Sequence, residues 1–317
     1  MWDLTVIGSG ISGFSAALFA ARRGLRVLVL GKEIGGQAAS TDLIENYPGI
    51  REIGGLDLVQ NIRRQAQAAG ADYLSAEAER IKPAGAEFVV TASGRQYKTR
   101  AVILALGKTP IDLGVPGEKE YLGKGLSYCA NCDLPFFRKK IVAVAGSGDL
   151  ATDASLMAAK YASQVYLIAE TRPGGHPALL TAIAKKKKIK VLSPCRVTAL
   201  AGKLKLAGLT VLDRTKNQAF KLPVDGLFVE QGFVVRSGFL QGLVDLDEAG
   251  QVMVGPSQET SCPGIFAAGD ATDRPYKQAV ISAGDAATAA LAAYDHLQRQ
   301  DGLKGLTSDW TQVKRVK

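Results

Sequence analysis

The chain has 317 residues, of which 47% are apolar and 22% are charged, a balance typical of a globular protein and not of a disordered one. No apolar run approaches the ~18 residues that a membrane-spanning helix needs, and four cysteines are too few for a disulfide scaffold. Because the sequence opens on a strand-like segment and not on a targeting segment, we expect a cytoplasmic protein that does not enter a membrane.

The net charge of +9 is concentrated in the middle of the chain. Residues 113–238 hold 19 Lys and Arg against 9 Asp and Glu, whereas all other residues hold 20 against 21. We expect no nucleic-acid binding, because aromatic residues are sparse and no basic helix or RNA-binding motif is present. The excess favours encounter with an acidic protein partner, and a solvated lysine-rich surface explains it equally well.

The first 30 residues predict a dinucleotide-binding unit. An apolar strand, a Gly-rich turn, an Ala-rich helix and a second strand follow one another within residues 3–30. In such a unit Gly8 permits the tight turn, Gly10 lets a pyrophosphate approach the backbone, and Gly13 lets the helix pack on the strand. Glu33 follows Gly13 by 20 residues, where a carboxylate accepts from a ribose hydroxyl.

A second unit of the same kind covers residues 140–168. Its glycine motif ends in Ala, a variant that still allows the helix to pack closely on the strand. An acidic residue again follows the second strand. The predicted second nucleotide site consists of Gly146, Gly148, Asp149, Ala151 and Glu170.

Two punctuated stretches, rich in Gly or Pro, separate the units near residues 110–117 and 231–239. We therefore predict an α/β fold with two Rossmann-like dinucleotide-binding domains, each a three-layer ββα arrangement. Residues 1–112 and 240–317 form the first domain. Residues 113–239 form the second domain, which is inserted into the first.

The inserted segment carries a Cys-Ala-Asn-Cys motif at Cys129 and Cys132. Such a motif is half of a zinc site or a redox-active pair. Zinc needs four ligands, and the remaining cysteines, Cys195 and Cys262, and the two histidines are all isolated, so we predict no metal. A redox dithiol fits better, with Asp133 either shuttling a proton or serving as a turn or cap residue.

In this order the motifs resemble those of low-molecular-weight thioredoxin reductases, over residues 3–298. The resemblance implies a flavin-dependent disulfide oxidoreductase. It rests on VIGSGISG, GKEIGGQ, ENYPG, CANCD, GSGDLA and GIFAAGDATDRPYKQAVISAG.

The resemblance implies that the first domain holds FAD. The pyrophosphate would lie at the three glycines of the first motif and the ribose at Glu33. The remaining implied contacts are Gln37 and Asn46 near the flavin, Asp270 at the ribityl–phosphate region, and Gln278 and Ala279 at the isoalloxazine edge.

The resemblance also assigns roles to the dithiol. Cys132 would face the flavin, Cys129 would attack the disulfide of a thioredoxin-like protein, and Asp133 would act as the acid–base residue. Members of the family are homodimers, and their inserted domain swings to present the dithiol alternately to flavin and to thioredoxin.

The chain departs from the family at the donor site. Members that use NADPH follow the second unit with a His-Arg-Arg cluster and a further Arg that bind the 2′-phosphate, whereas Glu170 lies in the matching stretch here. A carboxylate repels a 2′-phosphate by on the order of several kcal/mol when no cation compensates. We therefore expect a donor other than NADPH, and the second site would hold NADH, hold a second FAD, or be vestigial. The basic inserted domain makes an acidic protein such as ferredoxin a further candidate donor.

Two other functions are compatible with the same motifs. A flavin-dependent dithiol oxidase would form disulfides and pass electrons to oxygen, and a nucleotide-bound redox sensor would cycle without steady turnover. We expect the tail from Gly302 to Lys317 to be loosely ordered, and its Trp310 is a candidate for stacking on a flavin or a partner.

Overall fold

The computed structural model describes residues 1–41 and 43–305, which form two compact units. The first unit combines residues 1–108 with the chain from Val235 onward, and the second is the inserted segment Thr109–Val234. Trp310 and most of the tail lie outside the described residues.

The unit boundaries fall four and five residues before the predicted crossings. Strand β7 (Thr109–Pro110) pairs antiparallel with β16 (Phe233–Val234), and both belong to the inserted unit. Ser237, two residues after Val235, donates from Oγ to the carbonyl of Gly250 at 2.6 Å, which ties that stretch to the first unit.

The sheet of the first unit contains seven strands among the described residues. Strands β3, β2, β1 and β6 lie in that order and are parallel, as is β17 beside β6, whereas β5 and β4 continue the sheet in antiparallel fashion. Their bounds are β1 Trp2–Ile7, β2 Val27–Leu30, β3 Asp72–Leu74, β4 Ala78–Ala84, β5 Glu87–Ala92, β6 Arg95–Leu104 and β17 Ile265–Ala267.

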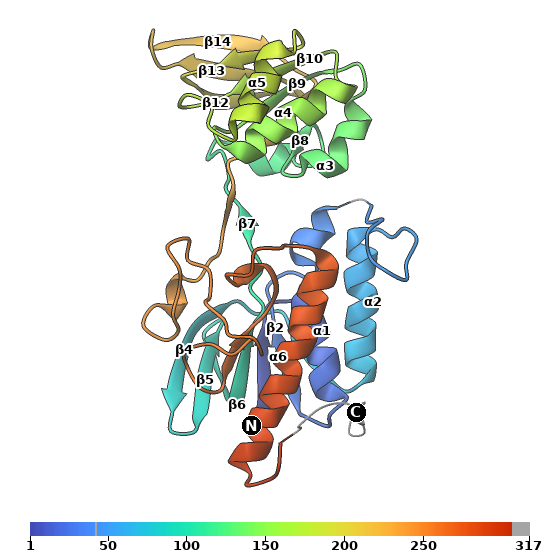
Figure 1. The fold of residues 1–317 in the computed structure, drawn as a ribbon, viewed down its shortest axis with the longest axis vertical. Helices are drawn as coiled ribbons and strands as arrows, with labels where there is room; N and C mark the ends of the chain where they lie inside the picture. The colour runs from blue at the N-terminus through green and yellow to red at the C-terminus, as the bar shows by residue number, and fades with distance from the viewer. Residues whose placement is uncertain (42, 306–317) are drawn as a thin grey trace, which may run out of the picture. The chain divides into compact units, whose positions relative to one another are not determined.

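Three helices pack together in the first unit: α1 (Ile11–Ala21), α2 (Gly55–Ala68) and α6 (Ala279–Gln300). Helix α1 contacts both of the others (Figure 1). Small side chains make this close packing possible, because Ala16, Ala17 and Ala20 of α1 are fully buried. The short helices of this unit are η1 Gly36–Ser40, η4 Gly238–Leu240 and η5 Gly269–Ala271.

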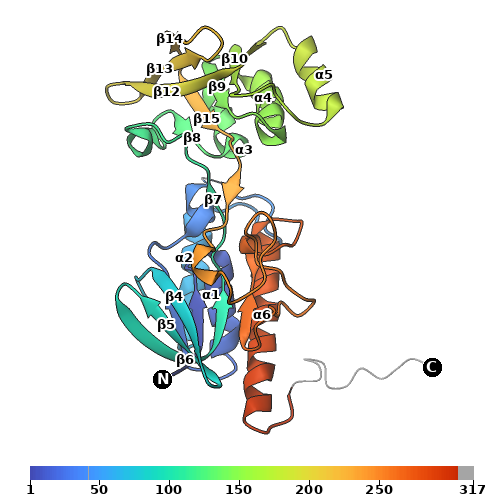
Figure 2. The ribbon, with the colours of Figure 1, turned by 90° about the vertical axis from the view of Figure 1, so that its left-hand side faces the viewer.

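The inserted unit has a parallel sheet in the order β11, β10, β9, β15, β8, with the antiparallel sheet β12, β13, β14 beside it and helices on the other face (Figure 2). Side chains of β9 alternate between the two cores, so Val142 and Val144 face the helices while Ala143 and Ala145 face the second sheet. The strands are β8 Leu126–Ser127, β9 Ile141–Ala145, β10 Gln164–Ile168, β11 Ile189–Leu192, β12 Cys195–Gly202, β13 Leu206–Asp213, β14 Gln218–Pro223 and β15 Gly226–Val229; the helices are η2 Glu118–Tyr121, α3 Ala130–Asp133, η3 Leu134–Phe137, α4 Asp149–Tyr161 and α5 Pro177–Lys185.

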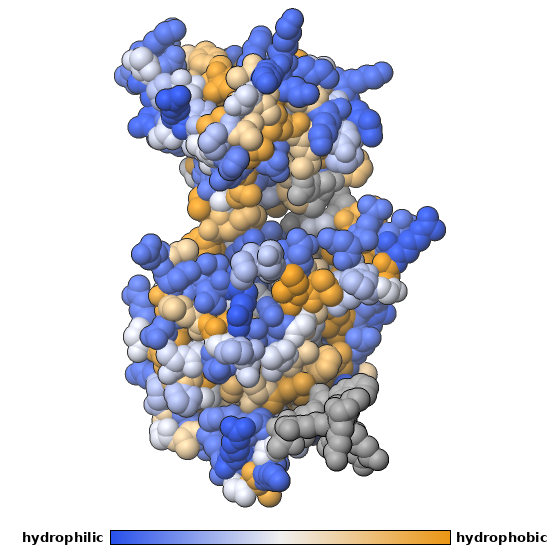
Figure 3. Space-filling model, in the orientation of Figure 1, coloured by the Kyte–Doolittle hydropathy of each residue, from blue (hydrophilic) through white to orange (hydrophobic). Residues whose placement is uncertain are grey.

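Both units are therefore Rossmann-like, as the sequence predicted, and each glycine motif lies at the carboxyl end of a central parallel strand. Hydrophilic side chains cover much of the face shown in Figure 3, with hydrophobic ones between them. Among the described residues, none of the helices combines the length and the hydropathy of a membrane-spanning segment.

Candidate functional site

The first glycine loop leaves no room for side chains at two of its three glycines. A Cβ at Gly8, whose φ is +122°, would lie 2.0 Å from the carbonyl oxygen of Ala105. A Cβ at Gly13 would lie 1.8 Å from the carbonyl oxygen of Gly8. Gly10 is more open, with Gly35 O the nearest atom to its Cβ position at 3.7 Å. The loop thus packs tightly on the sheet while Gly10 keeps its outer face bare.

The end of the second strand is fixed to this loop by Ser9. Its Oγ donates to the carbonyl of Glu33 at 2.5 Å, and its own carbonyl accepts from Gly35 N at 3.0 Å. The Glu33 side chain is exposed. Sequence reasoning did not single out Ser9, although a serine between two motif glycines is the position that can make this bond.

Ser12, in the first turn of α1, carries a buried Oγ with no hydrogen-bond partner among the described residues. It lies close to the loop before Asp270, because a Cβ at Gly269 would be 3.0 Å from Ser12 Oγ. A buried hydroxyl left without a partner costs about 1–3 kcal/mol. A polar ligand at the helix N-terminus would remove that cost, so the residues present fit the FAD that the first domain is predicted to hold.

Several predicted flavin-site residues that are distant in sequence meet in the first unit. Asn46 Nδ2 donates to Gln278 Oε1 at 3.1 Å, and Gln278 caps α6, whose first residue is Ala279. Asp270 accepts from Ser282 Oγ at 3.1 Å, and Lys108 Nζ lies 3.8 Å from Asp270 Oδ2. Neither Lys108 nor Ser282 was predicted from the sequence.

Gln37 lies in η1, on the exposed segment that follows the Glu33 loop. The segment continues from the bond between Ser9 and Gly35, so it begins beside the first glycine loop. The role of the Gln37 side chain toward the flavin stays a prediction.

The dithiol motif forms one helical turn in the inserted unit. Cys129 is the N-cap residue of α3 and is disulfide-bonded. Asp133 N donates to the carbonyl of Cys129 at 3.2 Å, which closes the turn, and Cys129 N donates to Ser127 Oγ at 2.9 Å. Residues at positions i and i+3 of a helical turn lie on one face, so the backbone suits a pairing of Cys129 with Cys132.

The other two cysteines, Cys195 and Cys262, carry free thiols. Burial raises the pKa of both thiols, which makes them less reactive than an exposed cysteine. The described residues contain no group of three or more His, Cys, Asp or Glu side chains placed to hold a metal ion.

A carboxylate network anchors the segment that leads into the dithiol. Tyr128 donates its hydroxyl proton to Glu118 Oε1, at 2.6 Å, with Asp112 Oδ1 3.1 Å away. Glu118 also accepts from Leu113 N and Gly114 N. Burial and the two carboxylates raise the pKa of Tyr128 above its ordinary value, so the phenol stays protonated as a donor.

The second glycine loop borders a pocket of about 290 Å³ within the inserted unit. The pocket includes Glu170, whose N–H donates to Ser147 Oγ at 3.1 Å, so a serine again ties the acidic residue to the loop. The predicted residues that line it are Gly146, Gly148 and Glu170; lining residues that were not predicted include Ser147, Cys195, Arg196 and Gln231.

Two other predicted residues of this site do not line the pocket. Asp149 Oδ1 accepts from His176 N at 2.8 Å and so holds the following loop. Ala151 is fully buried, and its Cβ lies 2.8 Å from where a Cβ on Gly146 would be. Ala151 therefore has the packing role of the third motif residue.

Glu170 has a cationic neighbour that its sequence position did not reveal. Arg214 Nη1 lies 3.6 Å from Glu170 Oε2 and donates to the Glu170 carbonyl at 3.1 Å. Arg214 follows β13 and is 44 residues away in the chain. Only the pairing of the sheet layers brings it to the pocket, so no local sequence pattern could have found it.

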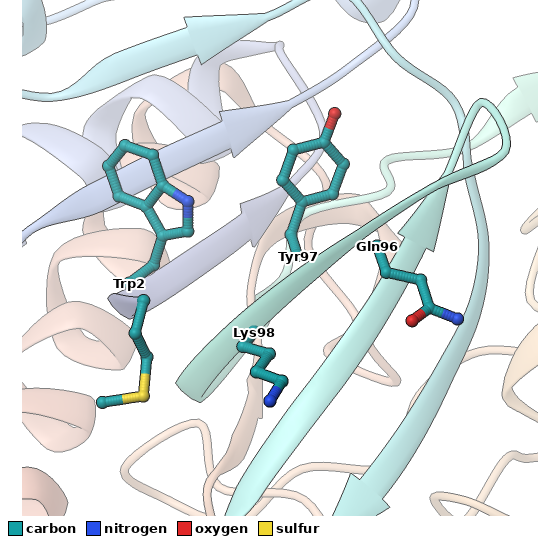
Figure 4. A pocket seen from close by; sticks show the side chains of 5 residues that line it. Trp2, Gln96, Tyr97 and Lys98 are labelled. Carbon is teal, nitrogen blue, oxygen red and sulfur yellow. The ribbon is translucent and has the colours of Figure 1, made fainter.

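A second pocket, of about 420 Å³, lies in the first unit and is lined by Met1 and Trp2 together with Gln96, Tyr97 and Lys98 (Figure 4). Trp2 begins β1, so this pocket is at the amino end of the strand and not at the carboxyl end, where Rossmann-like sheets bind nucleotides. It contains none of the predicted site residues.

Comparison with known proteins agrees with this geometry. The family model described as pyridine nucleotide-disulphide oxidoreductase matches residues 2–288. The bifunctional thioredoxin reductase/thioredoxin of Mycobacterium leprae is 39% identical, covering 95% of this chain and 67% of that protein. The thioredoxin reductase of Mycolicibacterium smegmatis is 37% identical, covering 94% of this chain and 97% of that one.

Solved structures give the same result. Thioredoxin reductase from Streptococcus pyogenes MGAS5005 superposes with a TM-score of 0.81 at 29% identity, covering 94% of this chain and 99% of that one. A Pseudomonas putida relative named for alkyl hydroperoxide reductase is 36% identical, and this chain spans only 58% of its length. The chain therefore belongs to the pyridine nucleotide-disulphide oxidoreductase family, as a flavin disulfide oxidoreductase of the thioredoxin reductase type.

Proposed function

We propose that this enzyme moves electrons from a donor other than NADPH, through FAD, to a Cys129–Cys132 disulfide and on to a thioredoxin-like protein. The donor is NADH, a second FAD or a ferredoxin-like protein. The observation that carries the proposal is the disulfide-bonded Cys129 at the start of a one-turn helix, in a chain whose first unit offers an unpartnered Ser12 at a glycine loop.

The first unit would hold FAD with residues already described. Gly10 leaves the pyrophosphate room to approach the start of α1, and Ser12 supplies a buried hydroxyl there. Glu33 would accept from the ribose, and Asp270, Asn46, Gln278, Ala279 and Gln37 would contact the rest of the molecule. When bound, FAD supplies the capacity to accept and release a pair of electrons.

The inserted unit would then carry out thiol–disulfide exchange. The Cys129 thiolate attacks one sulfur of the substrate disulfide, and the second cysteine displaces the substrate from the resulting mixed disulfide. Two electrons leave the chain's dithiol, which becomes a disulfide, and the substrate gains two electrons and two protons. Asp133 would hold or deliver a proton to a departing thiolate.

Glu170 supports a donor other than NADPH, because a carboxylate at the wall of the second pocket accepts from a ribose hydroxyl and repels a phosphate. Arg214 offsets part of that repulsion. The ion pair has both side chains about half exposed, so its attraction is weak and Glu170 stays available to a ligand hydroxyl.

The choice of acceptor rests on the relatives. One of them is named as a thioredoxin reductase joined to a thioredoxin, which supports a thioredoxin-like protein as the electron acceptor. A cytoplasmic homodimer is part of the same proposal and derives from the family resemblance.

Steady-state turnover with purified holoenzyme tests the proposal. Each candidate donor, namely NADPH, NADH and photoreduced ferredoxin, is combined with a thioredoxin, and new thiols are counted. We expect thiol production with NADH or ferredoxin, much less with NADPH, and none in Cys132→Ser. Disulfide reduction that persists in Cys132→Ser would refute the proposal. Dithiol-dependent hydrogen peroxide formation without thioredoxin reduction would identify a dithiol oxidase instead.

A further inference from the structure

Glu230 links the dithiol segment to the second glycine loop. It follows β15 directly, and its carboxylate Oε1 accepts from Ala130 N at 3.2 Å. Its backbone N–H donates to the carbonyl of Ala145 at 2.8 Å. Its carbonyl oxygen would lie 2.2 Å from a Cβ on Gly146, so only glycine lets the loop approach this closely. Glu230 is therefore held at its backbone while its side chain reaches the first N–H of α3.

The carboxyl group is in an unusual setting for an acid. Burial raises the pKa of Glu230 to about 7, the negative charge of Asp153 on α4 acts in the same direction, and the hydrogen bond from Ala130 acts in the opposite direction. Cys129, Cys132 and Asp133 are the other titratable groups of the segment that Glu230 contacts. Neither the dithiol motif nor the glycine motif accounts for an acidic residue at this position.

We propose that Glu230 is a positioning residue that sets the redox equilibrium of the dithiol through the peptide group joining Cys129 to Ala130. The proposal rests on the proposed function in one respect, namely that Cys129 and Cys132 are the redox pair. It is independent of the donor and of the thioredoxin-like acceptor.

The physical argument starts from the reduced form. Reduction of the disulfide by an external dithiol breaks the S–S bond, transfers two electrons and two protons, and leaves the external dithiol oxidised. Near neutral pH one thiol of such a pair releases its proton, and N–H groups at the start of a helix stabilise the thiolate. An ionised Glu230 occupies the Ala130 N–H and places a second negative charge beside it. Ionised Glu230 therefore favours the disulfide, and protonated Glu230 favours the dithiol.

Redox titration of the full-length holoenzyme tests this role without donor or acceptor. The protein equilibrates anaerobically with reduced and oxidised dithiothreitol in graded ratios, is quenched with acid and alkylated, and the labelling of Cys129 is read by peptide mass spectrometry. At pH 8 we expect Glu230→Gln to raise the ratio of dithiol to disulfide about tenfold, because a like charge is removed. For a two-electron couple this equals about 30 mV. At pH 6 the difference should nearly disappear, because the wild-type carboxyl is then protonated.

Asp225→Asn is the matched control. Asp225 also accepts from a backbone N–H, that of Ile141 at 2.9 Å, but at the opposite end of β9 from Ala145. The control should titrate as wild type at both pH values. A Glu230→Gln protein that matches wild type at pH 8, or an Asp225→Asn protein that shifts equally, would overturn the proposal. A Cys129 that stays unlabelled at every ratio would overturn both this proposal and the redox pair itself, whereas normal titration without turnover would count against the proposed function alone.

Discussion

The two glycine loops are built on the same plan and finish differently. In both, a serine after the first glycine bonds the backbone near an acidic residue: Ser9 to Glu33 and Ser147 to Glu170. The first loop then presents Ser12 with an unpartnered buried hydroxyl, whereas the corresponding residue of the second loop is Leu150, which is 46% exposed.

The acidic residues differ in the same sense. Glu170 has Arg214 beside it, and Thr152 in the second unit bonds the carbonyls of Gly148 and Gly174 at 2.7 and 3.0 Å. The second loop satisfies its polar groups with protein atoms. The first leaves a buried polar atom for a ligand, which teaches that an intact motif alone does not make two sites equivalent.

The largest effect should come from the dithiol, which only the inserted unit carries. We expect Cys129→Ser to lower disulfide reduction by at least about a thousandfold, because the attacking sulfur is lost. Thiol production with the functioning donor measures it. Cys262→Ser, which removes a free thiol from the first unit, is the control and should keep nearly full activity. Equal loss in both variants would point to general damage.

Exchanging the third motif residues tests the loops directly. Gly13→Ala places a Cβ 1.8 Å from Gly8 O, so the loop must deform, and FAD affinity should fall by about a hundredfold. Ala151→Gly should leave FAD binding in the first unit unchanged and lower stability by about 1 kcal/mol, because glycine weakens a helix. Flavin fluorescence and thermal unfolding measure the two effects. Retention of FAD by Gly13→Ala would contradict the close packing.

The unpartnered hydroxyl predicts a smaller change. Ser12→Ala should weaken FAD binding by about tenfold, the value of roughly one hydrogen bond to a charged group. The free protein should become slightly more stable, because a buried polar atom without a partner disappears. Leu150→Ala, at the corresponding position of the second loop, should leave FAD affinity as it is. Identical affinity in Ser12→Ala and wild type would show that this hydroxyl does not contact the ligand.

The smallest effect concerns the stability of the inserted unit. The pKa of Glu230 is about 7 in the folded protein against an ordinary 4.5, so the unfolded chain loses this proton at lower pH than the folded chain. Folding stability from this group therefore falls as the pH rises from 4.5 to about 7. Glu230→Gln should raise the Tm by a few degrees at pH 8 and by much less at pH 5. Melting curves with the same gain at both pH values would contradict the raised pKa.

The fold was predictable because its main features are local. Both glycine motifs lie between a short apolar strand and an Ala-rich helix, and the strand–turn–helix order determines the ββα architecture. The unit boundaries were predicted four and five residues late. The reason is that the pairing of β7 with β16 joins residues more than 120 positions apart, which no local pattern records.

The site was predictable only in part. Residues inside a motif, such as Gly8, Gly13 and Glu170, could be named from spacing. Arg214 and Lys108 reach their partners across the fold, and Glu230 contacts Ala130 from 100 residues away. Such contacts depend on strand order and loop packing, so their identification required the structure.

The most direct test of the central claim is an anaerobic titration of the FAD-loaded enzyme with NADPH, followed by flavin absorbance. The first unit should hold an oxidised flavin that dithionite bleaches and that stoichiometric NADPH leaves essentially unchanged. Rapid bleaching by one equivalent of NADPH would show that Arg214 and Arg196 compensate Glu170, and that the enzyme is an ordinary NADPH-dependent reductase.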